Sequence, residues 1–542
     1  MVAGQRQRAL ATVCLYLIAT ITCAQTHPVG DAPQNAALIA SPWPTYHAGP
    51  ARQASIALPG PTAATPHVDL RRFEDDAGVA FGTSPWHILS ARRYADAPQA
   101  RAIWGVSLKY VYKYVIDGDH FAYVDHQKLN DLPFFIGWNF FGLADGRIVV
   151  PNPSGLRTRA QRRSVCAGRE PALLVFNDGA TRDSGIECRS KFEFTAERLE
   201  AACGFRRTVT GTTPVAVNVT YSGHIAVQLR RETGRFGSKR RDTWLGMLDN
   251  GLTRFVACAK IAEGAATNGV PMLPVEGGGT RLFVATDDEI VPVLWEPQKR
   301  RITREVAVPV AYRGRTGTTP TVFGEGERQW LVTVDARCAV TKVFSGAITC
   351  SEDTRASAVV AVPLPLGSAA PVRVALPDFI DTVENSPAAA GFDLVVTNYS
   401  GYTPDGKKDG KPDRATGLVK LSWNPAPSRF QIDWQNAQLQ FSGVPTISTG
   451  ANLVYGSGAE ADGNTYFYGV RLRDDANGPA GALAVRVRLG AASNSSRRAR
   501  DAIYDAGNNV LINDDGSAIM AGGESLLRLR DAGVIAAPTE IP

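Results

Sequence analysis

A short acidic stretch is the first place in this sequence where the residue types could bind an ion. In DGKKDGKPD, residues 405–413, the carboxylates of Asp405, Asp409 and Asp413 stand at positions 1, 5 and 9 of a calcium-binding loop. Calcium prefers such oxygen ligands, but a lysine occupies position 3 and a threonine occupies position 12. The spacing therefore indicates either a weak calcium site or a solvated turn.

A second acidic group lies just before a predicted strand. Asp381, Glu384 and Asn385 fall within five residues of one another, ahead of a Ser-Pro pair. A carboxylate beside an amide could orient a polar ligand or a metal ion, and a hydrolase or lyase could use the carboxylates for catalysis. The alternative is that these groups satisfy backbone donors and acceptors where strands crowd together.

Six cysteines follow the first 24 residues, and an even number in an exported chain favours disulfides. Cys338 and Cys350 end the segment CAVTKVFSGAITC, which is typical of a hairpin, so we predict that they pair. Sequence alone does not decide the remaining connectivity, for which we predict Cys166–Cys188 and Cys203–Cys258. A metal or redox centre is disfavoured because no C-x-x-C motif is present.

The start of the chain has the features of a targeting segment. A basic beginning and the apolar run Ala9–Ile21 precede a small-residue cleavage site that ends at Ala24. We predict a signal peptide over residues 1–24, a flexible leader over residues 25–40, and a secreted or periplasmic protein. A retained anchor and an acylated Cys23 are the alternatives. No later apolar run is long enough to span a bilayer.

The composition favours short strands and many turns. The chain has 542 residues, of which 52 are glycine and 34 are proline, and this is typical of an all-β fold. Its net charge of +6 comes from short, scattered basic clusters, which indicate solvated loops rather than a nucleic-acid surface. We expect a monomer with a small-molecule or protein partner and without a membrane span.

One strand–turn–strand unit recurs along the chain, and its fullest copy is Thr316–Asp335. A proline usually opens the unit, where its missing N–H removes no ladder bond. When the proline-free unit at Ile136–Val150 is counted, the units open on average about 60 residues apart; the opening prolines are Pro85, Pro214, Pro271, Pro320, Pro387 and Pro445. Ile136–Val150, with its Asp-Gly turn, and the segment after Asn509 supply two further units.

Eight β units of this length predict an eight-bladed β-propeller of four-stranded antiparallel blades over residues 41–542. A blade has two apolar faces, and neighbouring blades bury them when the ring closes. The last unit is too short for four strands, so we expect His67–Phe73 to join it and close the ring. Aromatic residues late in each unit are expected to pack between blades.

In a propeller, the loops that enter the innermost strands surround one mouth of the central channel. This arrangement would bring Asn139 and Asn268 near Asp381, Glu384 and Asn385. We therefore take this mouth as the candidate ligand-binding site.

The Ser/Thr-Pro openings, the segment SPWPTYHAG and the spacing near 60 residues resemble the quinoprotein alcohol dehydrogenase-like, or PQQ-like, eight-bladed propeller superfamily. Members that bind the quinone carry a repeated A-x-D-x-x-T-G-x-x-x-W motif. Ala285, Asp287 and Trp295 match one copy, but Ile290-Val291 replace its Thr-Gly pair. The resemblance covers residues 41–530 and implies the fold.

The chain has only one partial copy of the quinone-docking motif, and that copy lacks the Thr-Gly pair. We expect a ligand- or partner-binding, or scaffold, module without a quinone cofactor, and a calcium ion remains open at residues 405–413. The alternative is an oxidoreductase that uses PQQ and calcium to act on an alcohol or a sugar.

Overall fold

The structure is a computed structural model. It describes residues 34–531 apart from residues 73–85, 91–93, 95, 107–109, 130–138, 153–164, 167, 169, 206–210, 234–239, 265–268, 287, 311–317, 343–346, 351–355, 382, 384, 399–415, 425–427, 442, 461, 492–509 and 523–524. The predicted signal peptide and the predicted calcium loop at residues 405–413 therefore lie outside the described residues.

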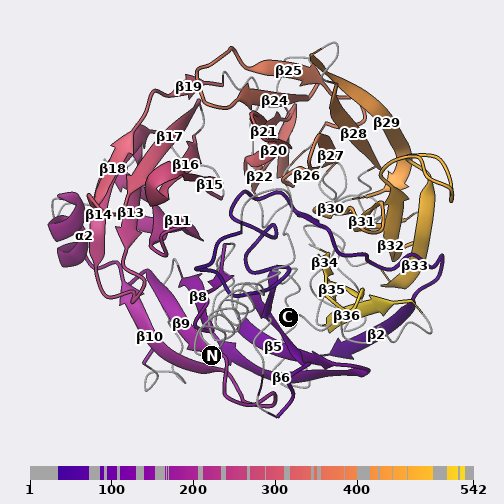
Figure 1. Cartoon of the computed structure of the whole chain (residues 1–542), viewed down its shortest axis with the longest axis horizontal. Coiled ribbons are helices and arrows are strands. Elements are labelled where there is room, and N and C mark those ends of the chain that lie inside the picture. The colour runs from indigo at the N-terminus through magenta and orange to yellow at the C-terminus, as the bar shows by residue number, and fades with distance from the viewer. Residues whose placement is uncertain are drawn as a thin grey trace, which may run out of the picture.

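Eight antiparallel sheets form a ring, so the predicted eight-bladed propeller is confirmed (Figure 1). We number the blades in chain order and give their strands from the innermost outward. Blade 1 contains β3 (Trp86–Ser90), β4 (Arg101–Val106), β5 (Tyr110–Asp117) and β6 (His120–Lys128). Blade 2 contains β7 (Phe141–Gly142), β8 (Arg147–Asn152), β9 (Ala172–Asn177) and β10 (Glu187–Glu193). Blade 3 contains β11 (Gly211–Val219), β12 (Ile225–Thr233), β13 (Arg240–Leu248) and β14 (Phe255–Glu263). Blade 4 contains β15 (Met272–Val275), β16 (Gly279–Ala285), β17 (Glu289–Glu296) and β18 (Arg301–Arg304).

The second half of the ring repeats this order. Blade 5 contains β20 (Thr321–Glu325), β21 (Arg328–Asp335), β24 (Ala358–Pro363) and β25 (Val372–Ala375), and the hairpin β22 (Cys338–Lys342) and β23 (Ala347–Cys350) is inserted after β21. Blade 6 contains β26 (Ala388–Ala390), β27 (Asp393–Thr397), β28 (Thr416–Asn424) and β29 (Arg429–Gln440). Blade 7 contains β30 (Thr446–Ser448), β31 (Leu453–Ala459), β32 (Asn464–Arg471) and β33 (Leu483–Ala491). Helix α2 (Ala196–Cys203), the 3₁₀ turn Glu276–Gly278 and the short β19 (Val308–Pro309) lie in the connections and edges.

Blade 8 joins the two ends of the described chain, as the sequence predicts. It contains β34 (Leu511–Ile512), β35 (Ala518–Gly522) and β36 (Ser525–Arg530), and β2 (His67–Arg72) pairs antiparallel with β36 as its outermost strand. The turn between β34 and β35 reaches blade 1, where Arg101 holds the Asp514 carboxylate at 2.6 Å. Ring closure therefore depends on one strand from the beginning of the described chain and three from its end.

The blades pack face to face through their middle strands, because these strands are apolar on both faces. All of β4 and all of β31 are buried. Aromatic side chains fill the interface between blades 5 and 6, where the Trp330 and Trp423 rings lie 4.5 Å apart and Phe323 and Phe430 lie 5.4 Å apart. The predicted packing role of the aromatic residues is confirmed at this interface.

The central channel is crossed by the chain's own N-terminal segment, residues 35–58 (Figure 1, indigo). Innermost strands of four successive blades donate backbone hydrogen bonds to it: Met272 to Pro50, Val322 to Ala51, Ala389 to Gln53 and Ile447 to Ala54. Residues Ser55–Ile56 form β1, which runs parallel to β30. We call residues 45–56 the axial segment.

Part of the predicted flexible leader also belongs to the folded body. Asn35 donates from its side chain to the Val219 carbonyl, and the backbone N–H of Ile39 donates to Gly142. Leu38 and Ile39 are buried. Residues 35–40 therefore pack on blades 2 and 3, because they carry apolar side chains that these blades can cover.

Two of the predicted disulfides are confirmed. Cys166–Cys188 and Cys203–Cys258 are bonded, with Cα atoms 6.0 Å and 5.1 Å apart. Cys338 and Cys350 stand directly opposite each other in the β22–β23 hairpin, the backbone register that their predicted pairing requires. Among the described residues, no helix is long and apolar enough to cross a membrane.

Candidate functional site

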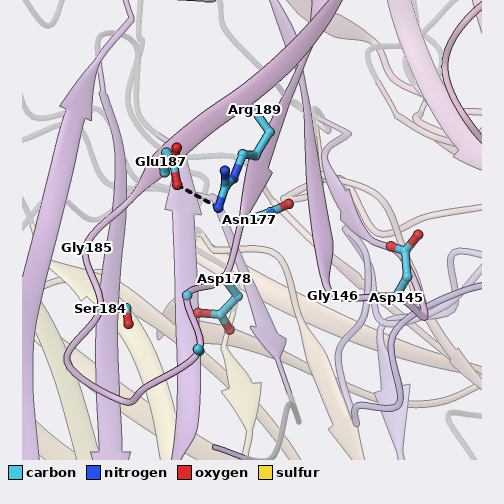
Figure 2. A pocket seen from close by; sticks show the side chains of 10 residues that line it. Asp145, Gly146, Asn177, Asp178, Ser184, Gly185, Glu187 and Arg189 are labelled. Atoms are coloured by element: carbon cyan, nitrogen blue, oxygen red, sulfur yellow. Dashed lines mark ion pairs between the residues drawn. The ribbon is translucent and has the colours of Figure 1, made fainter.

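A pocket of about 560 Å³ opens at one end of blade 2 (Figure 2). Two hairpin ends form it: the turn between β7 and β8, and the connection between β9 and β10. The lining residues are Asp145, Gly146, Asn177, Asp178, Gly179, Ala180, Ser184, Gly185, Glu187 and Arg189. Its volume is in the usual range for small-molecule sites.

The first wall is a tight turn that the Asp-Gly pair predicts. Gly146 has a positive φ of 86°, and its N–H donates to the Leu143 carbonyl at 2.8 Å. Arg147 binds the Asp145 carboxylate and also donates to Asn250 at the end of blade 3. Burial raises the pKa of Asp145, but the hydrogen bonds and charge of Arg147 outweigh it, so the pKa lies below its ordinary value. Asp145 is therefore a carboxylate at neutral pH.

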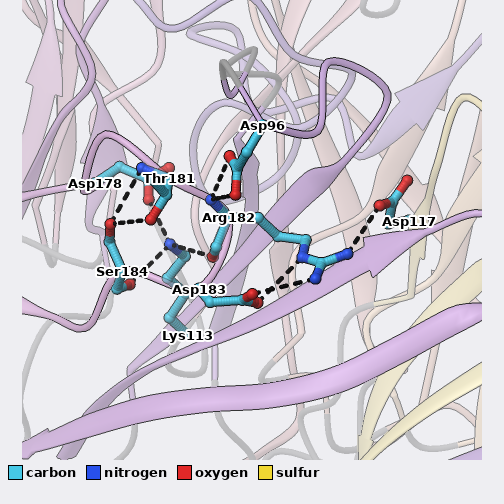
Figure 3. A network of polar contacts seen from close by, with 8 residues as sticks. All are labelled: Asp96, Lys113, Asp117, Asp178, Thr181, Arg182, Asp183 and Ser184. Atoms are coloured by element: carbon cyan, nitrogen blue, oxygen red, sulfur yellow. Dashed lines mark hydrogen bonds and ion pairs between the residues drawn. The ribbon is translucent and has the colours of Figure 1, made fainter.

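An ion pair with no solvent exposure lies beneath the pocket lining at Asp178. Lys113 of β5 lies 2.9 Å from the Asp178 carboxylate, and both side chains are 0% exposed. Tyr94 donates its hydroxyl to the second Asp178 oxygen at 2.7 Å. Lys113 also donates to the carbonyls of Arg182 and Ser184, both at 3.1 Å (Figure 3). The buried ammonium thus has three acceptors, and it ties the connection between β9 and β10 to blade 1.

Three carboxylates of blade 1 also bind the connection between β9 and β10. The Arg182 guanidinium pairs with Asp117 of β5 at 3.1 Å, and its backbone N–H donates to Asp96 at 3.0 Å (Figure 3). The backbone N–H of Ile186 donates to Asp125 at 2.7 Å. Because these anchors come from blade 1, the pocket wall is fixed before any ligand arrives, which lowers the entropic cost of binding.

The other wall carries an exposed ion pair. Glu187 and Arg189 of β10 lie 2.9 Å apart, with 60% and 55% of their side chains exposed. Their neighbour Cys188 is bonded to Cys166, and this disulfide tethers the strand. The pocket therefore combines amide, hydroxyl, carboxylate and guanidinium groups with glycine backbone. Within the described ranges, no group of three metal-ligating side chains could hold a metal ion.

The site that the sequence predicts lies elsewhere. Asn139 is buried just before β7, and Asn385 is buried just before β26. Asp381 pairs with Arg337 at 3.3 Å, and its carbonyl accepts from Cys338 at the base of the inserted hairpin. Asn268 and Glu384 lie outside the described residues.

The topology separates this mouth from the pocket. The loops that enter innermost strands lie at one end of each blade, and the turns that follow the first and third strands lie at the other. Asn139 precedes β7, whereas the pocket is built after β7 and after β9. The pocket is thus on the opposite face from the predicted mouth.

Sequence reasoning missed Lys113 and Asp178, although one signal was present. Lys113 is the single charged residue within YVYKYV, a stretch that is otherwise apolar or aromatic and is buried throughout. A lysine in such a strand needs a buried partner. The partner, Asp178, is 65 residues away in a polar turn, so no local pattern identifies it.

The tryptophan of the partial quinone-docking motif packs between two blades. Trp295 is fully buried and donates from its indole nitrogen to the Ser222 hydroxyl at 3.2 Å. Its ring lies edge-on to His224, with centroids 5.1 Å apart, so it joins blade 4 to blade 3. Asp287 lies outside the described residues.

No family model and no curated protein matches this chain. Solved structures that match include a putative 6-phosphogluconolactonase from Bacteroides uniformis ATCC 8492, with 11% identity and a TM-score of 0.35 over 69% of this chain and 90% of the other. A putative 6-phosphogluconolactonase from Bacteroides fragilis NCTC 9343 has 10% identity and a TM-score of 0.35 over 77% of this chain and 100% of the other. At these values the likeness carries no inference about activity.

Proposed function

We propose that this protein is a binding protein for a small, uncharged, hydroxyl-rich ligand of the size of a mono- or disaccharide. The observation that carries the proposal is the pocket at the end of blade 2. It is large enough for such a ligand, and it presents both hydrogen-bond donors and acceptors on a preformed wall. Sugar hydroxyls donate and accept at once, so they require such a mixture.

The charge balance of the pocket favours an uncharged ligand. The Asp178 carboxylate is neutralised by Lys113, and Glu187 is neutralised by Arg189. Asp145 is paired with Arg147 beside the pocket. No unbalanced charge is left among these groups to attract an ion, so selectivity must come from hydrogen bonds.

The contents of the channel favour this site over the axial cofactor site of a quinoprotein. The axial segment occupies the centre of the ring and is bonded to blades 4 to 7. A cofactor of the size of a quinone at the axis would have to displace a segment whose backbone is paired with these strands. The pocket on blade 2 requires no such displacement.

The test is a ligand screen with a matched pair of variants. Neutral mono- and disaccharides are screened by thermal shift, and hits are measured by isothermal titration calorimetry. We expect at least one sugar to bind, and we expect Glu187→Gln with Arg189→Gln to weaken it about tenfold or more, because hydrogen bonds to charged groups are lost.

The control replaces a similar exposed pair on blade 4, Glu296→Gln with Arg301→Gln, where the side chains lie 2.7 Å apart. This variant should bind the same sugar as tightly as the parent protein. The proposal fails if no sugar binds, or if both double variants reduce the affinity equally.

A further inference from the structure

The axial segment folds into a strained loop at the centre of the ring. His47, Ala48, Arg52 and Ala54 all have positive φ, between 50° and 69°. The N–H groups of Gly49 and Ala54 both donate to the His47 carbonyl, which closes the loop. Non-glycine residues adopt this backbone region at a cost, so four of them within eight residues indicate a conformation maintained for function.

A buried guanidinium points into this loop. Arg52 is 0% exposed, and it donates to the Thr45 hydroxyl and to the carbonyls of Tyr46 and Val217. These acceptors are a hydroxyl and two carbonyls, all uncharged, and Arg52 forms no ion pair with a carboxylate among the described residues. Its Nε has no acceptor in the described structure. Burial lowers the pKa of Arg52 to about 10, so it remains a cation at neutral pH.

A buried histidine lies beside it with both ring nitrogens unpartnered. His47 is 0% exposed, and neither Nδ1 nor Nε2 has a hydrogen-bond partner in the described part of the chain. Burial and then the charge of Arg52 lower the pKa of His47 well below its ordinary value, so its imidazole is neutral. A neutral imidazole keeps one N–H that can be donated.

Arg52 is a cation without a counter-ion in the described structure, and its Nε–H and one ring N–H of His47 are unused donors. A small anion would match both the charge and the donors. We propose that the axial segment binds one small monovalent anion, such as chloride, between the Nε of Arg52 and the ring of His47. The anion would offset the cost of burying the Arg52 charge. The full enclosure of both side chains favours a monatomic ion over a larger phosphate or organic acid.

The first test locates the ion directly. Crystals of the whole protein are grown in sodium bromide, and anomalous scattering from bromine is measured. We expect an anomalous peak within hydrogen-bond distance of Arg52 and His47. Density for water alone at this position, without an anomalous peak, would overturn the proposal.

The second test measures linkage in solution. At constant ionic strength, replacing sodium gluconate by sodium bromide should raise the melting temperature, because a ligand that binds the folded state stabilises it. Arg52→Met should abolish this response. If that variant does not fold, the bromide dependence of the melting temperature is measured for His47→Leu. This variant loses one hydrogen bond to a charged ligand, so its apparent bromide affinity should be about tenfold weaker.

The control is Arg101→Met on blade 1, where the guanidinium has the Asp514 carboxylate as its own partner. This variant should be less stable but should keep the full bromide response. A bromide response that is unchanged in folded His47→Leu, or that is lost equally in Arg101→Met, would contradict the axial site. Neither result depends on whether the blade 2 pocket binds a sugar.

Discussion

At the scale of single residues, the two fully buried cations of the described chain, Lys113 and Arg52, differ in their partners. Lys113 has a carboxylate partner and two carbonyl acceptors, whereas Arg52 has neutral acceptors only among the described residues. A buried ion is tolerated when its charge and its donors are both satisfied. Because Lys113 has a carboxylate partner, we assign it a structural role. Because Arg52 has none among the described residues, we propose that it binds an anion.

Removing the anchor should be costly. We expect Lys113→Met to destabilise the protein by about 3 to 5 kcal/mol, because the Asp178 carboxylate is left buried without its partner. Urea denaturation measures the loss. The double variant Lys113→Met with Asp178→Leu should recover much of it, since no lone charge remains. Equal stability of the single and double variants would rule out this explanation.

A third cation, Lys420 on blade 6, predicts a response to acid. It lies 2.7 Å from both Asp393 and Asp433. Burial raises the pKa of Asp433, but its bonds to Lys420, Ser422 and Gln431 outweigh this, and the pKa lies below its ordinary value of 3.8. Its contribution to stability is therefore complete above pH 3.8 and is lost as the pH falls through the lowered pKa.

The variant Asp433→Asn should accordingly lose about 1 to 2 kcal/mol at neutral pH, as expected for hydrogen bonds to a charged group. Its stability should then fall less steeply than that of the parent protein below pH 3.8. Chemical denaturation at neutral and acid pH checks both parts. Parallel acid profiles for the two proteins would contradict the assignment.

At the scale of elements, the seam between blades 8 and 1 is where the ring closes. Arg528 of β36 donates to the Gly118 carbonyl at 2.8 Å, and Arg101 of β4 binds Asp514 in the turn after β34. The remaining strand of blade 8 is β2, which comes from the beginning of the described chain. Contacts at this seam therefore stabilise the whole ring rather than one blade.

We expect Asp514→Ala to reduce the free energy of unfolding by about 2 to 4 kcal/mol, because it leaves the mostly buried Arg101 without its carboxylate. The comparison is Glu296→Ala, whose partners are exposed and lie within one blade, so its expected loss is much smaller. Denaturation curves for both variants test the difference. If both variants lost the same free energy of unfolding, the contact between blades 8 and 1 would contribute no more to stability than an exposed pair within one blade.

At the scale of the whole molecule, the axial segment acts as a central support for the ring. Its backbone accepts hydrogen bonds from four blades, and Trp43 just before it is fully buried. Blades 4 to 7 therefore depend on a segment that precedes all of them in the chain. Such long-range contacts form late in folding because loop closure must be offset first.

Deleting residues up to 58 should abolish the cooperative fold rather than open a channel, although β2 is retained. The N–H groups of Met272, Val322, Ala389 and Ile447 would lose their acceptors, at about 1 kcal/mol or more each. Circular dichroism melting and gel filtration measure the result. The control deletion of residues 1–33 should melt as the parent protein does, and a folded monomer from the longer deletion would refute the prediction.

Much of the fold could be predicted because each blade is a local unit. The Asp145–Gly146 turn, the hairpin after Asn509 and the closing strand follow from periodicity and turn residues. The structure contains all three, with the closing strand at His67–Arg72. The disulfide pairs Cys166–Cys188 and Cys203–Cys258 are also confirmed. These features depend on contacts within a blade or between neighbours in sequence.

The candidate site could not be predicted in the same way. Asp178 and Lys113 come from different blades, and Glu187 and Arg189 look like ordinary solvated charges in the sequence. The predicted mouth rested on the assumption that the channel is open. The axial segment crosses it instead, because its alanines and Trp43 have apolar surface to bury and its backbone groups need partners.

The amino-acid sequence by itself determined that this chain builds repeated β hairpins, that eight of them must close a ring, and that its two ends must share the last blade, since strand period and turn chemistry are local. Tertiary structure alone decided what fills the axis and where a pocket opens, since both depend on side chains brought together from distant blades. A buried charge such as Arg52 or Lys113 acquires its meaning only from the partners that folding places around it.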